Sequence, residues 1–255
     1  MAAEEQASRE PRLRVGAKHA VVIGATGLVG ESLVAELLRH GAYARVTAVA
    51  RDRASLTRRH GSRLDTVPWP PLAHGAPLAA VREAAEGLLP DGDDLYSCLG
   101  TTRRQAGSAE RFAWIDRTLN LGFAQAAAAR GFRQYALVSS AGADPRSLWL
   151  YPRVKGELEV AVKALPFWGL YLFRPGLLLG QRRDPRLGER LAEPLVRLAR
   201  RVAPRGLGAR VGTPADELAR AMTVAMQSTR GGVRTFAAEE IPVLAEARLP
   251  EMPRP

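Results

Sequence analysis

Residues His19–Gly30 have the sequence HAVVIGATGLVG, and this stretch decides the fold class. The apolar run His19–Ile23 is typical of a buried β-strand, and three glycines in a GxxGxxG spacing follow it directly. Apolar residues at helical spacing begin at the end of the turn, namely Leu28, Leu33, Val34, Leu37 and Leu38. The sequence therefore predicts a strand, a glycine turn and a helix in immediate succession.

Such a unit places the pyrophosphate of a dinucleotide at the helix N-terminus, where unpaired backbone N–H groups and the helix dipole favour negative charge. Gly24 permits the tight turn, Gly27 lets the backbone approach the phosphates, and Gly30 lets the helix pack close to the strand. Because the glycines lie between a predicted strand and a predicted helix, we expect a dinucleotide site here. The expected cofactor contacts are Gly24, Ala25, Thr26, Gly27, Leu28, Val29 and Gly30.

Length and composition indicate a single α/β domain, since the chain has 255 residues of which 46% are hydrophobic. We expect a polar tail over 1–16, one domain over 17–248 with substrate-side elements in about 176–215, and a loose tail over 249–255. Neither a membrane-spanning helix nor a secretory signal is expected, because no apolar run reaches about 18 residues and the N-terminus carries acidic side chains. Cys98 is the only cysteine, which excludes an intramolecular disulfide and favours a cytoplasmic location.

The formal net charge of +11 is compatible with a nucleic acid partner, but the distribution of the charges argues against one. Of the 37 basic residues 34 are arginine, and they are spread along the whole chain. No basic cluster is interleaved with aromatic residues that could stack on bases. The four histidines do not have the spacing of metal ligands. We therefore expect a small-molecule substrate, and neither a nucleic acid nor a metal ion.

The end of the second predicted strand, Val46–Ala50, bears on the choice of nicotinamide cofactor. An acidic residue about 20 positions past the glycines binds the ribose hydroxyls of NAD, whereas an arginine accommodates the 2′-phosphate of NADP. Arg51 occupies that position and Arg53 follows it, with Asp52 between them. The arginines favour NADP(H). The alternative is a solvated strand end in an arginine-rich protein.

A further strand is predicted over Asp94–Leu99, and the turn Gly100-Thr101 follows it at the edge where α/β sheets bind ligands. Cys98 lies in this apolar strand and is interpreted as a core residue instead of a nucleophile. A short strand is also expected within Leu64–Trp69, where prolines end regular structure.

Helical patterns continue through the second half of the chain. Asn120 lies within a predicted helix over Ala109–Arg130, either as an exposed polar side chain or as a functional residue. An amphipathic basic helix is expected over 188–203, with a core stripe and a solvated face favoured over a membrane-surface helix. The sequence further predicts a helix over Pro214–Met226 with Thr213 as its N-cap, and a last strand over Val233–Ala237.

Tyr151 and Lys155 form a YxxxK pair, which places both side chains on one face of a predicted helix. Hydride transfer to a carbonyl requires a proton donor at the forming alkoxide, and a tyrosine can serve if a nearby lysine ammonium favours tyrosinate. The lysine can also bond the cofactor ribose. Ser139 and Ser140 follow the predicted strand Tyr135–Val138, and a serine hydroxyl can hold the substrate oxygen. Together with the glycine turn, this arrangement indicates an oxidoreductase site.

The chain resembles the short-chain dehydrogenase/reductase superfamily over roughly residues 18–240. It is most similar to the atypical branch that contains the Tat-interacting oxidoreductase and its bacterial relatives. The matching stretches are GATGLVG, CLGTTRRQAGS, SSAGAD, YPRVKGELE and FRPGLLLGQR. The resemblance implies a doubly wound parallel sheet of the Rossmann type, with a small C-terminal substrate-side lobe and an NADP(H) site.

The resemblance also implies roles for individual residues. Tyr151 would be the acid/base, Lys155 its partner and a ribose ligand, and Ser140 or Ser139 the hydroxyl that orients the substrate. Further cofactor contacts are implied along the strand ends that follow, at Leu99, Gly100, Thr101, Pro175, Leu178 and Arg186.

The sequence thus predicts an NADP(H)-dependent oxidoreductase that acts on a carbonyl or alcohol, without naming the substrate. Because a fold does not determine a function, other classes stay open. One is an NADPH-binding regulatory protein without turnover that acts through protein partners. Another is a nucleotide-sugar epimerase-like enzyme, and a third is the nucleic acid binder. A homo-oligomer is also compatible with the sequence.

Overall fold

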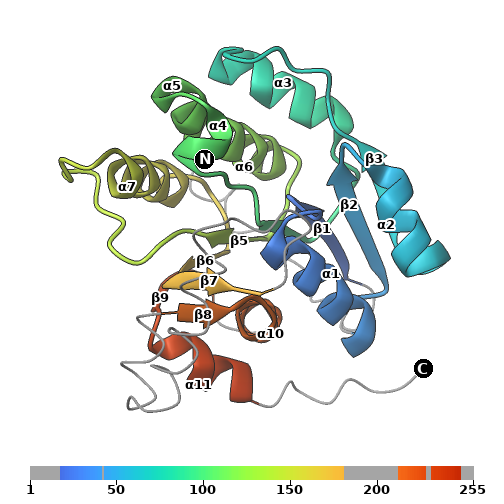
Figure 1. The fold of residues 1–255 in the computed structure, drawn as a ribbon. Helices are drawn as coiled ribbons and strands as arrows, with labels where there is room; N and C mark the ends of the chain where they lie inside the picture. The colour runs from blue at the N-terminus through green and yellow to red at the C-terminus, as the bar shows by residue number, and fades with distance from the viewer. Residues whose placement is uncertain (1–17, 42, 181–211, 228–230, 248–255) are drawn as a thin grey trace, which may run out of the picture.

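A computed structural model of the chain describes residues 18–41, 43–180, 212–227 and 231–247, and these contain a seven-stranded parallel sheet (Figure 1). The strand order is β3-β2-β1-β4-β5-β6-β9. The strands are β1 (His19–Ile23), β2 (Arg45–Ala50), β3 (Asp65–Pro68), β4 (Asp94–Ser97), β5 (Gln134–Val138), β6 (Gly169–Arg174) and β9 (Gly232–Ala237). The chain winds outward from β1 to β3 and then continues on the other side from β4, which is the doubly wound topology. The predicted fold class is confirmed.

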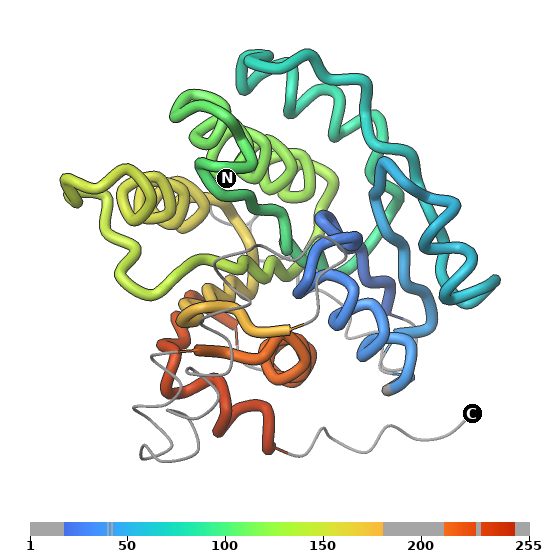
Figure 2. The backbone as a smooth tube through the Cα atoms, in the orientation of Figure 1, coloured from blue at the N-terminus to red at the C-terminus, as the bar shows by residue number. Residues whose placement is uncertain are grey.

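Helices cover both faces of this sheet. One face carries α1 (Leu28–His40), α10 (Ala215–Met226) and α11 (Glu240–Glu246), and the other carries α3 (Leu78–Leu88), α6 (Asn120–Ala129) and α7 (Leu150–Lys163). Although far apart in sequence, α1 and α10 pack side by side (Figure 2). The short α2 (Arg53–His60) and η1 (Gly61–Arg63) connect β2 to β3.

The alternating side chains of β1 show why helices must pack on both faces of the sheet. Ala20 and Val22 are buried in the core under α1 and α10, whereas Val21 and Ile23 are buried in the core under α3 and α6. A strand that is apolar on both faces fits the centre of a parallel sheet, with helices above and below it. The run His19–Ile23 therefore accounts for the central place of β1.

The outer strands explain two details of the sequence. The predicted strand within Leu64–Trp69 is confirmed as β3, and its last residue, Pro68, is tolerated because β3 lies at the edge of the sheet. The predicted last strand is confirmed as β9 at the opposite edge. The strand expected over Asp94–Leu99 ends at Ser97, so Cys98 lies just beyond β4.

The predicted helix over Ala109–Arg130 has an irregular centre. It follows the short α4 (Arg103–Ala106) and consists of α5 (Ala109–Ala113), the π-helical segment η2 (Trp114–Leu119) and α6. A π-helical turn is wider than an α-helical turn, so it changes which side chains of the helix face the sheet. Asn120, for which an exposed position was one expectation, is completely buried where η2 meets α6.

The C-terminal part adds a second, two-stranded sheet, in which β7 (Leu177–Leu179) pairs in parallel with β8 (Gly212–Pro214). The prediction that Thr213 caps the following helix is wrong. Its hydroxyl accepts a 3.1 Å hydrogen bond from the backbone N–H of Gly176, and α10 begins at Ala215 without a side-chain cap. The expected helix over 188–203 lies outside the described residues. Within the part of the chain that is described, no helix is long and apolar enough to span a membrane.

Candidate functional site

The glycine turn between β1 and α1 has the geometry that its spacing predicted. Gly24 has φ +76°, and a Cβ on it would lie 2.6 Å from the carbonyl carbon of Cys98. A Cβ on Gly30 would lie only 2.1 Å from the carbonyl oxygen of Gly24. Since real Cβ atoms do not approach backbone atoms so closely, the fold itself requires glycine at both positions.

Gly27 differs from the other two glycines. The only nearby atom for a Cβ at this position would be the carbonyl oxygen of Gly24, at 3.3 Å. Gly27 is the N-cap of α1, and no side chain caps the helix there. The first N–H groups of α1 are therefore not covered by a capping side chain, which is the arrangement that suits a phosphate.

At the carboxyl end of β2, Arg51, Asp52 and Arg53 have different environments. Asp52 is the N-cap of α2, and its Oδ1 accepts a 3.0 Å hydrogen bond from the backbone N–H of Ser55. Arg53 donates a 3.1 Å hydrogen bond to Thr66. Arg51 is exposed, and none of the hydrogen bonds or ion pairs within the described chain involves its side chain.

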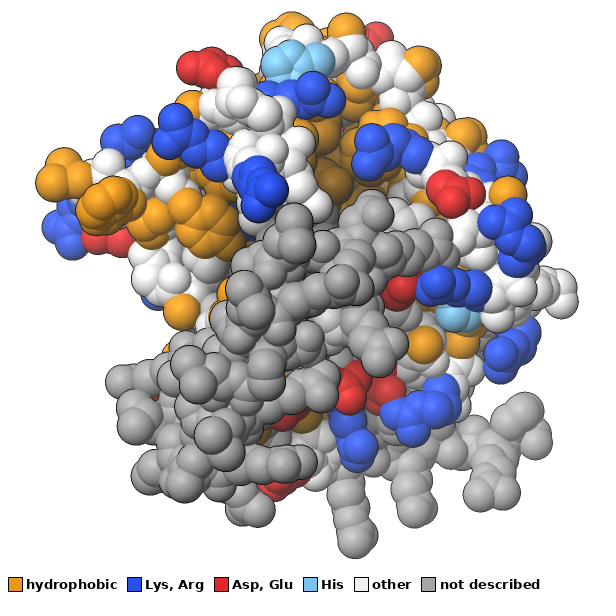
Figure 3. Space-filling view, in the orientation of Figure 1, with side chains coloured by type: hydrophobic (Ala, Val, Ile, Leu, Met, Phe, Trp, Pro, Cys, Tyr) orange, Lys and Arg blue, Asp and Glu red, His pale blue; other side chains and the backbone are white. Residues whose placement is uncertain are grey.

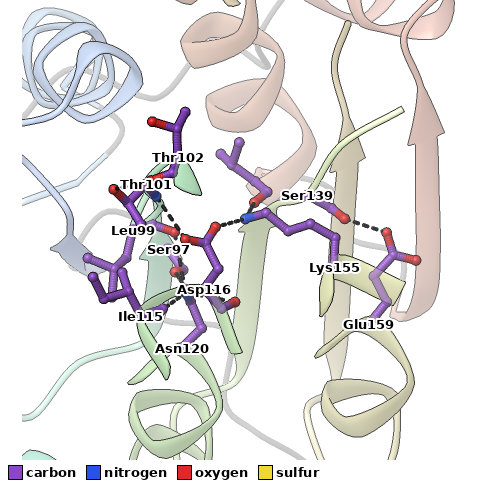
Figure 4. A network of polar contacts seen from close by, with 11 residues as sticks. Ser97, Leu99, Thr101, Thr102, Ile115, Asp116, Asn120, Ser139, Lys155 and Glu159 are labelled. Carbon is purple, nitrogen blue, oxygen red and sulfur yellow. Dashed lines mark hydrogen bonds and ion pairs between the residues drawn. The ribbon is translucent and has the colours of Figure 1, made fainter. Parts of the chain in front are cut away.

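The turn after β4 lies beside Asp116 of η2 and Lys155 of α7. The backbone N–H of Thr101 donates a 2.8 Å hydrogen bond to Oδ2 of Asp116, which lies on η2. A Cβ on Gly100 would lie 3.3 Å from Oδ1 of Asp116 and 3.6 Å from Nζ of Lys155. The turn therefore lies directly against the buried polar groups of Figure 4.

Lys155 is buried and has two polar partners. Its Nζ forms a 2.8 Å ion pair with Oδ1 of Asp116 and donates a 3.5 Å hydrogen bond to the carbonyl oxygen of Val138. Both charged side chains are almost completely buried. Burial alone would lower the pKa of Lys155, but the charges of Asp116, Tyr151 and Glu159 outweigh it and raise that pKa above the ordinary lysine value.

Tyr151 lies one turn before Lys155 on α7, so the predicted YxxxK helix is confirmed. Its ring stacks on Phe112 with a centroid distance of 5.6 Å, and 44% of the residue is exposed.

Nearby, a Cβ on Gly156 would lie 2.2 Å from the backbone nitrogen of Pro145, so the chain after the serines packs tightly on α7. The glycine after Lys155 thus permits α7 to lie close to the end of β5.

The two adjacent serines have different partners. Ser139 donates a 2.6 Å hydrogen bond from Oγ to Oε1 of Glu159, and Arg174 holds the same carboxylate with two hydrogen bonds of 2.9 and 2.6 Å. The Oγ of Ser140 is also buried, but it has no hydrogen-bond partner among the described residues. A buried hydroxyl without a partner is costly, so Ser140 is the serine whose hydroxyl a ligand could satisfy.

The segment after β6 reaches both the serines and the glycine turn. The carbonyl oxygen of Pro175 accepts a 2.8 Å hydrogen bond from the backbone N–H of Ala141. Leu178 packs against the same core as α1, and a Cβ on Gly180 would lie 2.8 Å from the side chain of Leu28. Arg186, another predicted cofactor contact, lies outside the described residues.

Sequence reasoning missed Asp116 and left Asn120 undecided. The side-chain amide of Asn120 donates to the carbonyl oxygens of Ile115, Asp116 and Leu99 at 3.1, 3.3 and 3.3 Å, and its Oδ1 accepts from Ser97. These contacts join η2 to the end of β4. Only the helical register could have identified the two residues, and the π-helical segment changes that register.

Cys98 has the properties of a core residue, as predicted. It packs against the core under α1, and burial raises the pKa of its thiol to about 12. The thiol is therefore protonated at neutral pH and is not a nucleophile.

In the described ranges, no group of three or more histidine, cysteine or acidic residues has the arrangement of a metal site.

Arginines and lysines are dispersed over the face seen in Figure 3, with acidic side chains among them. Several arginines form surface ion pairs, including Arg45–Asp65 at 2.5 Å, Arg59–Glu31 at 2.7 Å and Arg82–Glu86 at 2.6 Å. Hydrophobic side chains gather at the left of the same view, where Figure 1 places α7. Leu148 and Trp149, just before α7, are 94% and 80% exposed.

Comparison with known proteins agrees with this geometry. A family model described as NAD(P)H-binding matches residues 24–164. A fungal relative named "Protein fmp52, mitochondrial" from Emericella nidulans is 37% identical over 173 residues, which cover 67% of this chain and 71% of the relative. "Protein HTATIP2" from Rattus norvegicus is 36% identical over 177 residues, with 69% of each chain covered.

Solved structures share the fold at low sequence identity. MoeE5 in complex with UDP-glucuronic acid and NAD is 19% identical, with a TM-score of 0.60, and the match covers 86% of this chain and 76% of that one. A UDP-glucose 4-epimerase from Thermotoga maritima is 14% identical, with a TM-score of 0.59 and coverage of 92% and 86%. At such identities the likeness concerns the fold alone.

The relatives contradict the expected cytoplasmic location. Several fungal proteins between 35% and 38% identical to this chain are named mitochondrial. The expectation of a cytoplasmic location was wrong because it depended on the cysteine count. A single cysteine excludes an intramolecular disulfide but does not identify a compartment.

Proposed function

The chain belongs to the NAD(P)H-binding family, and on this premise we propose that it is an NADP(H)-dependent oxidoreductase acting on a carbonyl or alcohol. The observation that carries the proposal is the arrangement at the carboxyl end of the sheet. Tyr151 and Lys155 share one face of α7, and Ser140 offers a buried hydroxyl without a partner in the described chain. These are the groups that carbonyl reduction needs.

The residues present fit a bound dinucleotide. The uncapped N-terminus of α1 at Gly27 would hold the pyrophosphate, and the turn at Gly100 leaves room beside Lys155, whose ammonium would bond a ribose hydroxyl. When bound, the reduced nicotinamide supplies the hydride. Leu178, which packs against the same core as α1, would contact the bound cofactor.

Tyr151 and Ser140 would handle the substrate oxygen. The Ser140 hydroxyl would donate a hydrogen bond to the carbonyl oxygen, and Tyr151 Oη would donate the proton that converts the developing alkoxide into an alcohol. Lys155 is held charged by Asp116, so its ammonium can stabilise the tyrosinate that remains. Ser139 is excluded from this task because its hydroxyl is engaged by Glu159.

Two further features support finer parts of the proposal. Asp52 is engaged as the cap of α2, so the exposed Arg51 is the side chain available to a 2′-phosphate, which favours NADP(H) over NAD. The exposed Leu148 and Trp149 lie three and two residues before Tyr151, which favours an apolar carbonyl substrate over a charged one.

The test combines cofactor binding with turnover. Purified protein is titrated with NADPH by calorimetry, and consumption of NADPH is then followed with a panel of apolar and charged aldehydes and ketones. We expect NADPH to bind and an apolar carbonyl to be reduced. Tyr151→Phe should retain NADPH binding, because the ring still stacks on Phe112, but lose roughly 100-fold or more in kcat.

Leu148→Ala provides the matched control, because Leu148 is exposed and lies in the same segment. It should retain kcat, with an effect confined to KM for apolar substrates. If NADPH does not bind, or if Tyr151→Phe turns over as fast as the wild type, the proposed function is wrong. Binding of NADPH without turnover of any carbonyl would instead support the regulatory protein.

A further inference from the structure

Asp116 joins two parts of the site that are distant in the sequence. Its Oδ2 accepts the 2.8 Å hydrogen bond from the N–H of Thr101, in the turn after β4, and its Oδ1 forms the 2.8 Å ion pair with Lys155 on α7. Figure 4 shows the carboxylate between these two groups. Gly100 has no side chain that would separate the turn from the ion pair.

The position of Asp116 is itself fixed by the helix that carries it. Asp116 lies in η2, and its carbonyl oxygen accepts a hydrogen bond from the buried amide of Asn120. The same amide donates to Leu99, at the start of the turn that Asp116 contacts. The π-helical segment therefore holds the carboxylate in one place relative to β4.

Asp116 is the carboxylate that balances the buried charge of Lys155. The side chains of Lys155 and Asp116 are 4% and 1% exposed, so water contributes little to solvating either charge. The titratable groups that face Lys155 are Asp116 from η2 and Tyr151 and Glu159 from α7. Glu159 already holds Ser139 and Arg174, which leaves Asp116 as the carboxylate in direct contact with the ammonium.

We propose that Asp116 is a positioning residue that keeps the Lys155 ammonium charged and holds it in a fixed place beside the Gly100-Thr101 turn. Asp116 would act through Lys155 and the turn, and not on the substrate. This inference rests on the proposed function for the importance of Lys155. The test measures the titration of Lys155 directly. The inference about Asp116 can therefore fail even if the protein reduces a carbonyl, and can hold even if it does not.

The chain contains only three lysines, Lys18, Lys155 and Lys163, so NMR of protein labelled with 13C in the lysine side chains can follow each one. The exposed Lys163 gives an internal reference. In the wild type, the Lys155 signal should titrate only above the ordinary lysine value of 10.5. In Asp116→Asn, burial is no longer opposed by a contacting carboxylate, so the midpoint should fall by at least about one pH unit.

The pH dependence of the affinity for NADPH is a second test of the Asp116→Asn variant. The affinity of Asp116→Asn for NADPH should begin to fall at least about one pH unit below the pH at which the affinity of the wild type falls, because Lys155 loses its charge earlier in the variant. Asp116→Glu should restore the charge of Lys155. Glu157→Gln is the matched control, because it removes a carboxylate of α7 that pairs with Arg117 and Arg153 at the surface.

The proposal is overturned if Lys155 titrates in Asp116→Asn as it does in the wild type, or if Glu157→Gln shifts it equally. A measurement on the wild type covers the case in which Asp116→Asn does not fold. The Lys155 ammonium protons should exchange with water far more slowly than those of Lys163. A fast-exchanging Lys155 ammonium would show that no fixed ion pair exists.

Discussion

The hydroxyl of Ser139 donates a 2.6 Å hydrogen bond to Oε1 of Glu159, which also binds Arg174. This contact joins the end of β5 to α7 and, through the arginine, to the end of β6. The Oγ of Ser140, the residue after Ser139, has no hydrogen-bond partner in the described chain. Two serines that are adjacent in the sequence therefore have different hydrogen-bond environments in the fold.

Ser140→Ala should lower kcat/KM for reduction of a carbonyl substrate by roughly 100-fold, because the hydroxyl proposed to bind the substrate oxygen is lost. Its free energy of unfolding should not fall, since the removed hydroxyl has no partner in the described chain. Ser139→Ala should show the opposite pattern, with unfolding free energy lower by about 1–3 kcal/mol. Steady-state kinetics and urea denaturation of both variants measure these effects. Equal kinetic losses in the two variants would contradict this division.

Gly27→Ala and Gly30→Ala should separate cofactor binding from stability. A Cβ at Gly30 would lie 2.1 Å from backbone, so we expect a loss of about 3 kcal/mol or more in unfolding free energy. At Gly27 the nearest atom would be 3.3 Å away, so the fold should persist while NADPH binding weakens by tenfold or more. Calorimetry and thermal denaturation read both quantities.

Gly87→Ala is the control for this pair. Gly87 lies inside α3 with no atom near its missing Cβ, so alanine should raise stability by about 0.5–1 kcal/mol. If Gly27→Ala binds NADPH as tightly as the wild type, the turn does not hold the cofactor phosphates.

Arg51→Ala should abolish a preference for NADPH over NADH. The exposed guanidinium is the group available to the 2′-phosphate, so its loss should weaken NADPH binding by roughly tenfold and leave NADH binding unchanged. Titrations with both nucleotides make the comparison. Arg58→Ala, at another exposed arginine in the last turn of α2, should leave the preference intact. An equal effect of the two substitutions would mean that general charge, and not Arg51, attracts NADPH.

His19 should make stability depend on pH at the start of β1. Its Nε2 lies 2.8 Å from the Thr47 hydroxyl, and burial lowers its pKa below the ordinary value of 6.5. The folded state therefore keeps His19 neutral where the unfolded chain takes up a proton. This contribution to stability is complete above pH 6.5 and is lost as the pH falls through the lowered folded pKa.

Urea denaturation at several pH values below 6.5 should show a steeper loss for the wild type than for His19→Gln. His74→Gln, which removes an exposed histidine that contacts Trp114, serves as the control and should retain the wild-type slope. If His19→Gln follows the wild-type curve, another group causes the acid sensitivity.

Local sequence signals were sufficient for most of the fold. The run His19–Ile23 is apolar on both faces, which required a central strand, and the glycine spacing identified the turn that follows it. The YxxxK spacing placed Tyr151 and Lys155 on one helix face because both lie within one regular α-helix. These inferences depend on residues that are close together in the chain.

The polar partners of these residues could not be found in this way. Asp116 meets Lys155 and Thr101 only after β4, η2 and α7 have packed together, and no local pattern encodes that contact. Asn120, which the sequence left as either an exposed polar residue or a functional one, is completely buried where η2 meets α6. Thr213 was misassigned as a helix cap for a related reason, since its hydroxyl binds the distant Gly176.

The location of Cys98 gives the protein a chemical reporter of its own. Cys98 is half-buried and its thiol is protonated at neutral pH, and the carbonyl carbon of Cys98 would lie 2.6 Å from a Cβ on Gly24. We expect an alkylating reagent to react slowly with this protonated thiol, and faster when the contact between the end of β4 and the glycine turn opens. Because the chain has one cysteine, the labelling rate of the unaltered protein reports on this region alone. A dinucleotide that closes this region would slow the labelling, which makes binding detectable before any substrate is known.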